Sequence, residues 1–127
     1  ASVEARRHAL RQYGPAAALD AWPTVSVVLV THRPDHLEHA FRQVAAKARL
    51  VRYGTDCYAY ALIAAGQIDL VIEAGLQAYD VQAPIAVIEA AGGIVTDWQG
   101  RPAHDGGRIL AAANAAIHAE ALALLNG

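Results

Sequence analysis

Three histidines stand close together at a spacing that a metal ion could use. His36 and His39 would share one face of a helix, where two imidazoles can bind the same zinc ion. His32 precedes that helix, and no cysteine or further histidine nearby completes the four ligands of a structural zinc site. We therefore predict a solvated loop and first helical turn at these histidines rather than a metal site.

The single cysteine is a second candidate for chemistry. Cys57 follows Gly-Thr-Asp at the start of a predicted helix, and a helix N-terminus lowers the pKa of a thiol. A cysteine nucleophile also needs a base beside it, and the sequence places no histidine to serve. The pattern therefore favours a buried core cysteine over a catalytic one.

Two carboxylates seven positions apart are the remaining candidates. Asp80 precedes a helical pattern and is predicted to be its N-cap, because an aspartate there accepts hydrogen bonds from free N–H groups. Glu73 ends a predicted strand, where it would either bind a ligand or lie in solvent. Both interpretations of Glu73 stay open at this point.

Two glycine pairs resemble phosphate-binding loops only superficially. Gly92-Gly93 and Gly106-Gly107 fit neither GxGxxG nor the Walker pattern. We predict a helix C-cap at the first pair and a tight turn at the second. Trp22 and Trp98 are predicted to pack against the core or its edge.

The elements that must position these residues alternate between strand and helix. Helical patterns are expected at 3–13, from Asp35 to 48, and at 55–65, 80–91 and 115–125; strands are expected at 24–31, 48–53, 68–73, 93–98 and 108–113. This alternation predicts one α/β domain over residues 1–127, a layered domain with a mixed or parallel sheet of about five strands and helices on its faces.

Composition narrows the class of protein. The chain has 127 residues, 55% of them hydrophobic, and a net charge of -2, which does not suggest a nucleic-acid partner. No apolar stretch is long enough to span a membrane, and the N-terminus has no apolar signal core. With one cysteine, these features predict a cytoplasmic protein that binds neither nucleic acid nor membrane.

Three stretches of the sequence resemble one known family in order and spacing. They are RYGTDCYAY at 52–60, GQIDLVIEAGL at 66–76 followed by Tyr79-Asp80, and IEAAGGIVTDWQG at 88–100. Over residues 49–127 the chain resembles the C-terminal half of the inositol-monophosphatase-type histidinol-phosphate phosphatases. The resemblance implies a layered fold in which Mg²⁺ activates a water that attacks a phosphate monoester.

The resemblance also implies roles for individual residues. Asp80 stands where the family binds a metal ion, and Glu73 where it contacts a substrate hydroxyl. Gly54, Thr55 and Asp56 stand where the family lines its substrate pocket. Tyr79 replaces the family's usual tryptophan, a change seen within the histidinol-phosphate branch.

One departure from the family bears on activity. The Asp-Pro-x-Asp-Gly-Thr loop and the glutamate ligand of the family's N-terminal half do not occur in this sequence. Two-metal hydrolysis needs several carboxylates, because one exposed carboxylate binds Mg²⁺ poorly. We therefore predict a folded, non-catalytic domain without a cofactor in isolation. A phosphatase subunit completed by another chain and a phosphate-binding module are the alternatives.

An exposed sheet edge or face, where the missing half would pack, also predicts a homo-oligomer.

The N-terminal segment resembles a different family. Residues 21–35, AWPTVSVVLVTHRPD, resemble the opening strand of family-2-like, GT-A-type glycosyltransferases, and this resemblance extends through residues 1–46. The sequence thus suggests a chimera joined near Ala46–Lys47. The alternative is a single divergent phosphatase fragment. No Asp-x-Asp metal motif follows, so sugar transfer is not expected.

Overall fold

The computed structural model describes residues 26–31, 35–54 and 57–127, with side chains from residue 39 onward. The predicted helical segment at 3–13 lies outside these residues. The elements are β1 (Ser26–Thr31), α3 (Asp35–Ala45), β2 (Leu50–Arg52), α4 (Cys57–Ala64), β3 (Leu70–Gln77), α5 (Ala78–Ala90), β4 (Ile94–Thr96), β5 (Gly106–Ala112) and α6 (Ala115–Asn126). Each predicted element within the described residues is present, which confirms the α/β fold.

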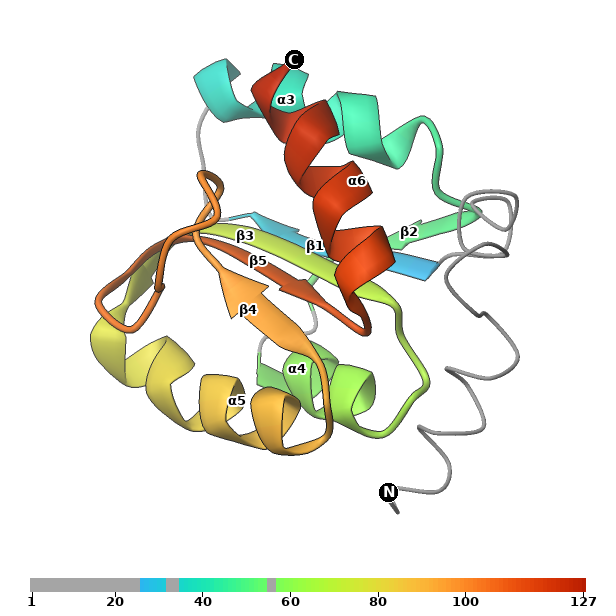
Figure 1. Ribbon diagram of the computed structural model, residues 1–127. Helices are drawn as coiled ribbons and strands as arrows, with labels where there is room; N and C mark the ends of the chain where they lie inside the picture. The colour runs from blue at the N-terminus through green and yellow to red at the C-terminus, as the bar shows by residue number, and fades with distance from the viewer. Residues whose placement is uncertain (1–25, 32–34, 55–56) are drawn as a thin grey trace.

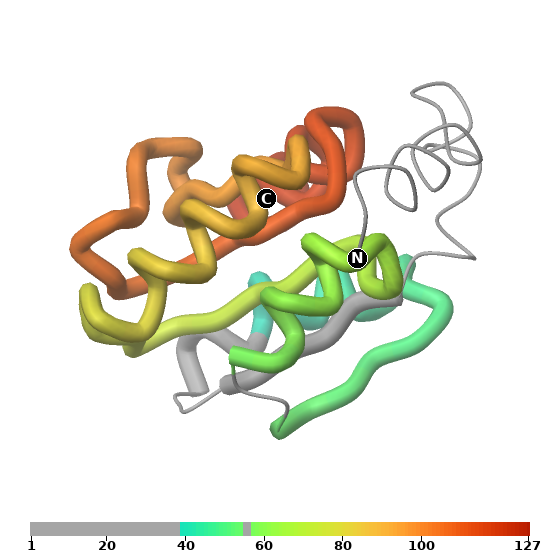
Figure 2. The backbone as a smooth tube through the Cα atoms, turned by 90° about the horizontal axis from the view of Figure 1, so that it is seen from below, coloured from blue at the N-terminus to red at the C-terminus, as the bar shows by residue number. Residues whose placement is uncertain are grey.

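The strands form one mixed sheet in the order β2-β1-β3-β5-β4. β1 pairs in parallel with β2 and β3, whereas β5 is antiparallel to both β3 and β4. α3 and α6 cover one face of the sheet and α4 and α5 cover the other (Figure 1). Seen from below, α4 and α5 lie side by side on their face (Figure 2).

β3 connects the two halves of the hydrophobic core. Its side chains alternate between the faces of the sheet. Leu70 and Ile72 pack with the α3–α6 layer, and Val71 packs with the α4–α5 layer. Because both faces are covered, β3 has the nearly continuous apolar sequence of a fully buried strand.

Several element boundaries differ from the prediction at one end of the sheet. β3 continues past Glu73 to Gln77, and β5 begins at Gly106 rather than at residue 108. The two strands stay paired there across a register shift between Glu73 and Leu76. The alternation of apolar side chains breaks down at this irregularity, and for this reason it does not predict the residues that extend β3 and β5 beyond it.

The two glycine pairs have the predicted local roles. Gly92 has a φ of 89°, and the N–H of Gly93 donates to the Ile88 carbonyl at 2.9 Å, which closes the C-terminus of α5. Gly106 and Gly107 both have positive φ at the turn into β5. Trp98 is buried and donates from Nε1 to the Ile109 carbonyl at 3.1 Å, as expected for a packing residue.

A buried histidine links α6 to the edge strand β4. His118 Nε2 lies 2.7 Å from Thr96 Oγ1, and that hydroxyl lies 2.7 Å from the Asp97 carbonyl. Because the hydroxyl hydrogen goes to the carbonyl, His118 must be the donor from Nε2. Burial lowers the pKa of His118 below its usual value.

This histidine predicts a pH dependence of stability. The folded-state pKa of His118 is depressed, so the unfolded chain binds the proton more readily. Its contribution should be complete above the unfolded pKa of about 6.5 and be lost as pH falls through the folded pKa. We expect the free energy of unfolding, measured with urea, to fall from pH 7 to pH 5, and His118→Gln to reduce that slope. The exposed His104→Gln is the control, and an unchanged slope in His118→Gln would contradict the assignment.

Candidate functional site

An open pocket of about 470 Å³ lies where α4, the end of β3 and the start of α5 meet. It is lined by Cys57, Tyr60, Glu73, Leu76, Tyr79, Asp80, Ala83 and Pro84. The sequence placed Glu73 and Asp80 together by resemblance alone. The strand-to-helix connection between them brings both carboxylates to this pocket.

Glu73 is buried, with only 4% of its surface exposed. Its position on β3 places its side chain on the same face as Val71, toward α4 and α5. Tyr60 of α4 donates its hydroxyl hydrogen to Glu73 Oε2. The interpretation of Glu73 as a solvated strand end is therefore wrong, because the packing of α4 against β3 covers this position.

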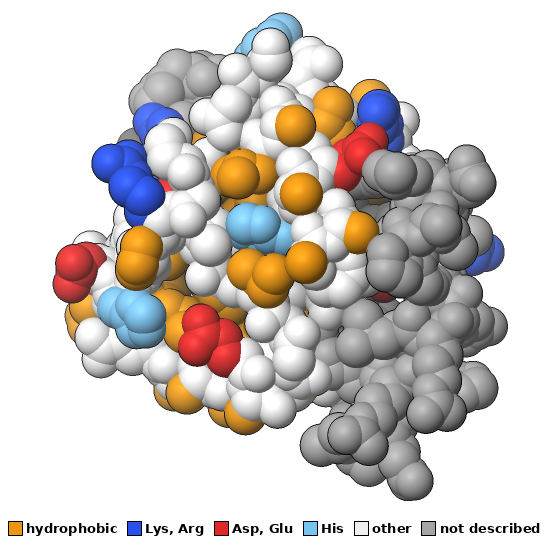
Figure 3. All heavy atoms as spheres, in the orientation of Figure 1, with side chains coloured by type: hydrophobic (Ala, Val, Ile, Leu, Met, Phe, Trp, Pro, Cys, Tyr) orange, Lys and Arg blue, Asp and Glu red, His pale blue; other side chains and the backbone are white. Residues whose placement is uncertain are grey.

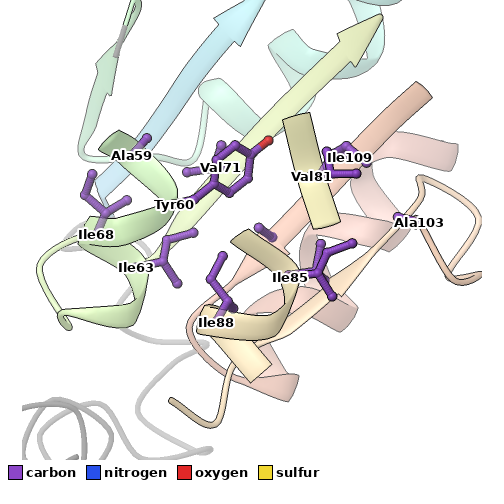
Figure 4. Close-up of a cluster of buried hydrophobic side chains, with 12 residues drawn as sticks. Ala59, Tyr60, Ile63, Ile68, Val71, Val81, Ile85, Ile88, Ala103 and Ile109 are labelled. Carbon is purple, nitrogen blue, oxygen red and sulfur yellow. The ribbon is translucent and has the colours of Figure 1, made fainter. Parts of the chain in front are cut away.

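Tyr60 was not predicted as a site residue. It is 3% exposed and belongs to the cluster of apolar side chains beneath the sheet. Figure 4 shows its ring within that cluster and its hydroxyl pointing away from Ile63 and Ile68. The helical spacing of Tyr60 predicts only that its side chain is buried in the core. The hydroxyl of a buried tyrosine normally needs a hydrogen-bond partner, and this was the one feature of the sequence that could have suggested a role in the site.

The bulge after Glu73 shapes the mouth of the pocket. Gly75 has a φ of 80° within the register shift between Glu73 and Leu76. Such irregularities turn a strand and redirect its side chains. Here the strand leaves Glu73 in the core and leads directly to Gln77 and the N-terminus of α5.

Asp80 lies one turn into the helix instead of preceding it. The N-cap is Gln77, and Asp80 at the third helical position accepts a hydrogen bond at Oδ2 from the Gln77 N–H, 2.8 Å away. Asp80 thus stabilises the helix start as a capping-box partner, and its prediction as the N-cap itself was wrong. Pro84 consequently falls beyond the first turn, where its lack of an N–H leaves the Asp80 carbonyl without the usual helical donor.

The side chains that line the pocket show how well it could bind a metal ion. Asp80 is exposed, and the Tyr60 hydroxyl stays protonated because burial raises the pKa of its phenol. Within the described part of the chain, no group of three or more His, Cys, Asp or Glu side chains gathers at one point. Asp80 can therefore contribute one ligand to a magnesium ion, but several further oxygen ligands must come from outside this group.

Thr55 and Asp56, like His32, lie outside the described residues, so their predicted roles stay predictions. Gly54 is exposed with a φ of 80° and is not among the residues that line the pocket. His39 is exposed in a separate groove between α3 and α6.

Cys57 is exposed at the start of α4 and lines the pocket, so the prediction of a buried core cysteine was wrong. It occupies the first helical position, where the helix has not yet reached the core.

The described residues form a mixed five-stranded sheet between two helical layers, with two carboxylates in a pocket at a strand-to-helix connection, and this defines an α/β domain with an acidic pocket. The sequence model of the inositol monophosphatase family matches residues 15–126. The chain belongs to the inositol monophosphatase family. The match includes residues 15–46, the stretch that resembles a glycosyltransferase, so one family accounts for most of both segments.

Individual relatives agree with this assignment. The chain is 52% identical over 67 residues to the bifunctional phosphatase IMPL2, chloroplastic, of Arabidopsis thaliana, covering 53% of this chain and 19% of that protein. It is 34% identical over 79 residues to a histidinol-phosphatase of Chlorobaculum parvum, covering 62% of this chain and 30% of that protein. The chain therefore spans less than a third of the length of these curated relatives.

A solved structure shows the same fold. An inositol monophosphatase from Zymomonas mobilis superimposes with a TM-score of 0.75 and 33% identity, covering 81% of this chain and 43% of that one.

Proposed function

We propose that this chain forms the C-terminal wall of a magnesium-dependent phosphatase site that hydrolyses histidinol phosphate or a related phosphate monoester. The observation that carries the proposal is the joint placement of Glu73 and Asp80 in one pocket. The similarity to IMPL2 and to a histidinol-phosphatase supports this substrate class. Asp80 would bind a magnesium ion, and Glu73 would contact a polar group of the substrate. Thr55 and Asp56 would line the same site, whereas Gly54 would contribute only the turn that precedes them.

We infer further that the described residues do not catalyse hydrolysis by themselves. A magnesium ion needs close to six oxygen ligands, and Asp80 supplies one carboxylate. Other ligands would come from polypeptide that packs beside α5. The alternative of a phosphate-binding module is less favoured, because the described lining carries two carboxylates and no cationic side chain. A phosphate group would be repelled there without a metal ion.

An apolar face marks where such polypeptide would pack. The outer surface of α4 and α5 exposes Tyr58, Tyr79 and Val87 at 64%, 81% and 52% of their surface. α4 carries no charged side chain, and a helix that is apolar all round is normally covered. Self-association into a homo-oligomer through this face is the alternative, and light scattering over a range of concentrations would detect it.

The face seen in Figure 3, which has the orientation of Figure 1, carries few charged side chains, of both signs, among hydrophobic and uncharged ones.

A chimeric origin and a cytoplasmic location are two further hypotheses about this chain. A chimera joined near Ala46–Lys47 is disfavoured by the family match over residues 15–46, and the encoding DNA would show a junction if one exists. A cytoplasmic location would be tested by cell fractionation, and one relative is named as chloroplastic. None of the helices in the described ranges is long and apolar enough to cross a membrane.

A segment exchange tests the proposed function. The matched 79 residues of the Chlorobaculum parvum histidinol-phosphatase would be replaced by those of this chain. We expect the hybrid to hydrolyse histidinol phosphate only with Mg²⁺, because the relative supplies the missing ligands. The 127-residue chain alone should show no turnover.

The parent histidinol-phosphatase serves as the positive control, and circular dichroism reports whether the hybrid folds. A folded hybrid without activity would argue against the phosphatase role. Turnover by the chain alone, lost on Asp80→Asn, would overturn the inference that it is non-catalytic.

A further inference from the structure

A proline interrupts the hydrogen bonding of α5 beside the pocket. Pro84 lies inside this helix, which begins at Ala78 and continues past the proline to Ala90. A proline has no N–H, and its ring crowds the carbonyl four residues earlier. In α5 that carbonyl belongs to Asp80, so the Asp80 carbonyl oxygen lacks the donor that any other residue at position 84 would supply.

The position of this carbonyl follows from the geometry of a helix. Each helical carbonyl is directed along the axis toward the residue four positions on, and residues three and four apart lie on the same face. Asp80, Ala83 and Pro84 all line the pocket, so the carbonyl between them opens onto it. Across the pocket stands α4, which contributes Cys57 and Tyr60.

The two acceptors of Asp80 are directed at different places. Its carboxylate points back toward the start of α5, where Oδ2 accepts the Gln77 N–H at 2.8 Å. Its carbonyl points the other way, toward Pro84. The carbonyl is therefore available to a group other than the one that the carboxylate serves.

The packing of α5 does not account for a proline at this position. The buried side chains of the helix are Val81, Ile85 and Ile88, whereas Pro84 is half-buried. An interior proline strongly disfavours a helix. Residues that oppose their own element cluster at functional sites, where the group that they expose is used.

We propose that Pro84 frees the Asp80 carbonyl to accept a hydrogen bond from a hydroxyl or ammonium donor on the organic part of the bound phosphate monoester. The carbonyl oxygen contacts the ligand, and Pro84 is the specificity-determining residue that keeps this acceptor open. The inference rests on the proposed function for the phosphate monoester. It adds a contact made by the main chain, separate from both carboxylates of the pocket.

Restoring the missing N–H tests this inference in the full 127-residue chain. Pro84→Ala and Pro84→Val both supply an N–H to the Asp80 carbonyl, and valine keeps an apolar side chain close to proline in size. L-Histidinol, which carries both donors, would be titrated against ¹⁵N-labelled protein. Imidazole, which keeps the ring but has neither the hydroxyl nor the ammonium group, is the comparison ligand.

We expect L-histidinol to cause saturable shifts of the amide signals of residues 80–83 in the wild type. Its binding should weaken by about three- to tenfold in both variants, because the new N–H occupies the acceptor. Binding of imidazole should change by less than about twofold. Pro102→Ala, which removes an exposed proline outside the pocket, is the control and should leave the affinity for L-histidinol unchanged.

Stability separates a role in binding from a role in structure. The urea midpoint of Pro84→Ala should rise by about 0.5–1 M, because the helix gains a hydrogen bond and loses a steric clash. Weaker L-histidinol binding in a more stable protein supports the inference. A fall in both the midpoint and the affinity would assign Pro84 to the structure of α5 and overturn it.

Two other results would also overturn the inference. One is a wild type that does not respond to L-histidinol, or folded variants that bind it as tightly as the wild type. The other is weaker binding in Pro84→Ala but not in Pro84→Val, which would assign the effect to the lost proline ring.

The two proposals fail separately. L-Histidinol binding that depends on Pro84, together with a folded but inactive hybrid, would leave the carbonyl contact standing without the phosphatase role. An active hybrid, together with L-histidinol binding that is the same with and without Pro84, would do the reverse.

Discussion

Gly106→Ala is expected to destabilise the domain by about 3 kcal/mol or more, the sum of a left-handed backbone penalty and overpacking. Gly106 has a φ of 84°, and a Cβ there would lie 2.4 Å from the Leu76 carbonyl oxygen and 2.7 Å from the Gln77 carbonyl carbon. These are backbone atoms at the end of β3, so a side-chain rotation cannot relieve the contact. Urea unfolding followed by circular dichroism would measure the loss.

The neighbouring glycine provides a matched control. Gly107 has a φ of 85°, and a Cβ there would meet nothing within 4 Å. Gly107→Ala should cost only the backbone penalty, about 1–2 kcal/mol. Equal destabilisation by the two variants would show that the close approach of β5 to the β3–α5 connection is not what requires Gly106.

Asp80→Asn is expected to lower the activity of the hybrid phosphatase by about 100-fold or more, since losing a metal-bound carboxylate removes several kcal/mol of transition-state stabilisation. Its effect on folding should be small. The asparagine oxygen can still accept the hydrogen bond from the Gln77 N–H, so we expect a stability loss of no more than about 1 kcal/mol. Turnover of histidinol phosphate at several magnesium concentrations, together with urea unfolding of the 127-residue chain, measures the two effects.

Comparing activity with stability separates the two roles of Asp80, as a ligand of the metal ion and as the capping-box partner of α5. Asp105→Asn, an exposed carboxylate outside the pocket, is the control and should change neither quantity appreciably. If Asp80→Asn lowers stability strongly but leaves activity intact, Asp80 serves the helix alone. Intact activity with intact stability would remove Asp80 from the site altogether.

The sequence was informative where a local pattern reports a local structure. The apolar runs around Leu70 and Ile109 located the two central strands, because burial on both faces leaves few polar positions. The glycines at 92 and 106 marked real changes of backbone direction, since positive φ is a property of the residue itself. Resemblance then placed Glu73 and Asp80 in one site.

What the sequence missed depends on contacts between distant elements. The bulge between Glu73 and Leu76 forms only when β5 pairs with β3, so neither the strand length nor the position of Asp80 in the helix followed from periodicity. The burial of Glu73 required α4 to cover it and Tyr60 to donate to it. No spacing rule links residues 60 and 73, because the connection is made by tertiary packing.

The position of β1 in the sheet means that this chain cannot be divided at Ala46–Lys47 into two independently folded parts. β1 comes from residues 26–31 but lies between β2 and β3, both of which follow Ala46–Lys47 in the sequence. A cut at that point would remove an internal strand of the sheet and leave β2 without its only neighbour among the described strands. The two pieces would be interlocking fragments that must associate to fold. Exchange at this junction would therefore transplant a strand and a helix into a shared core, not a self-contained module.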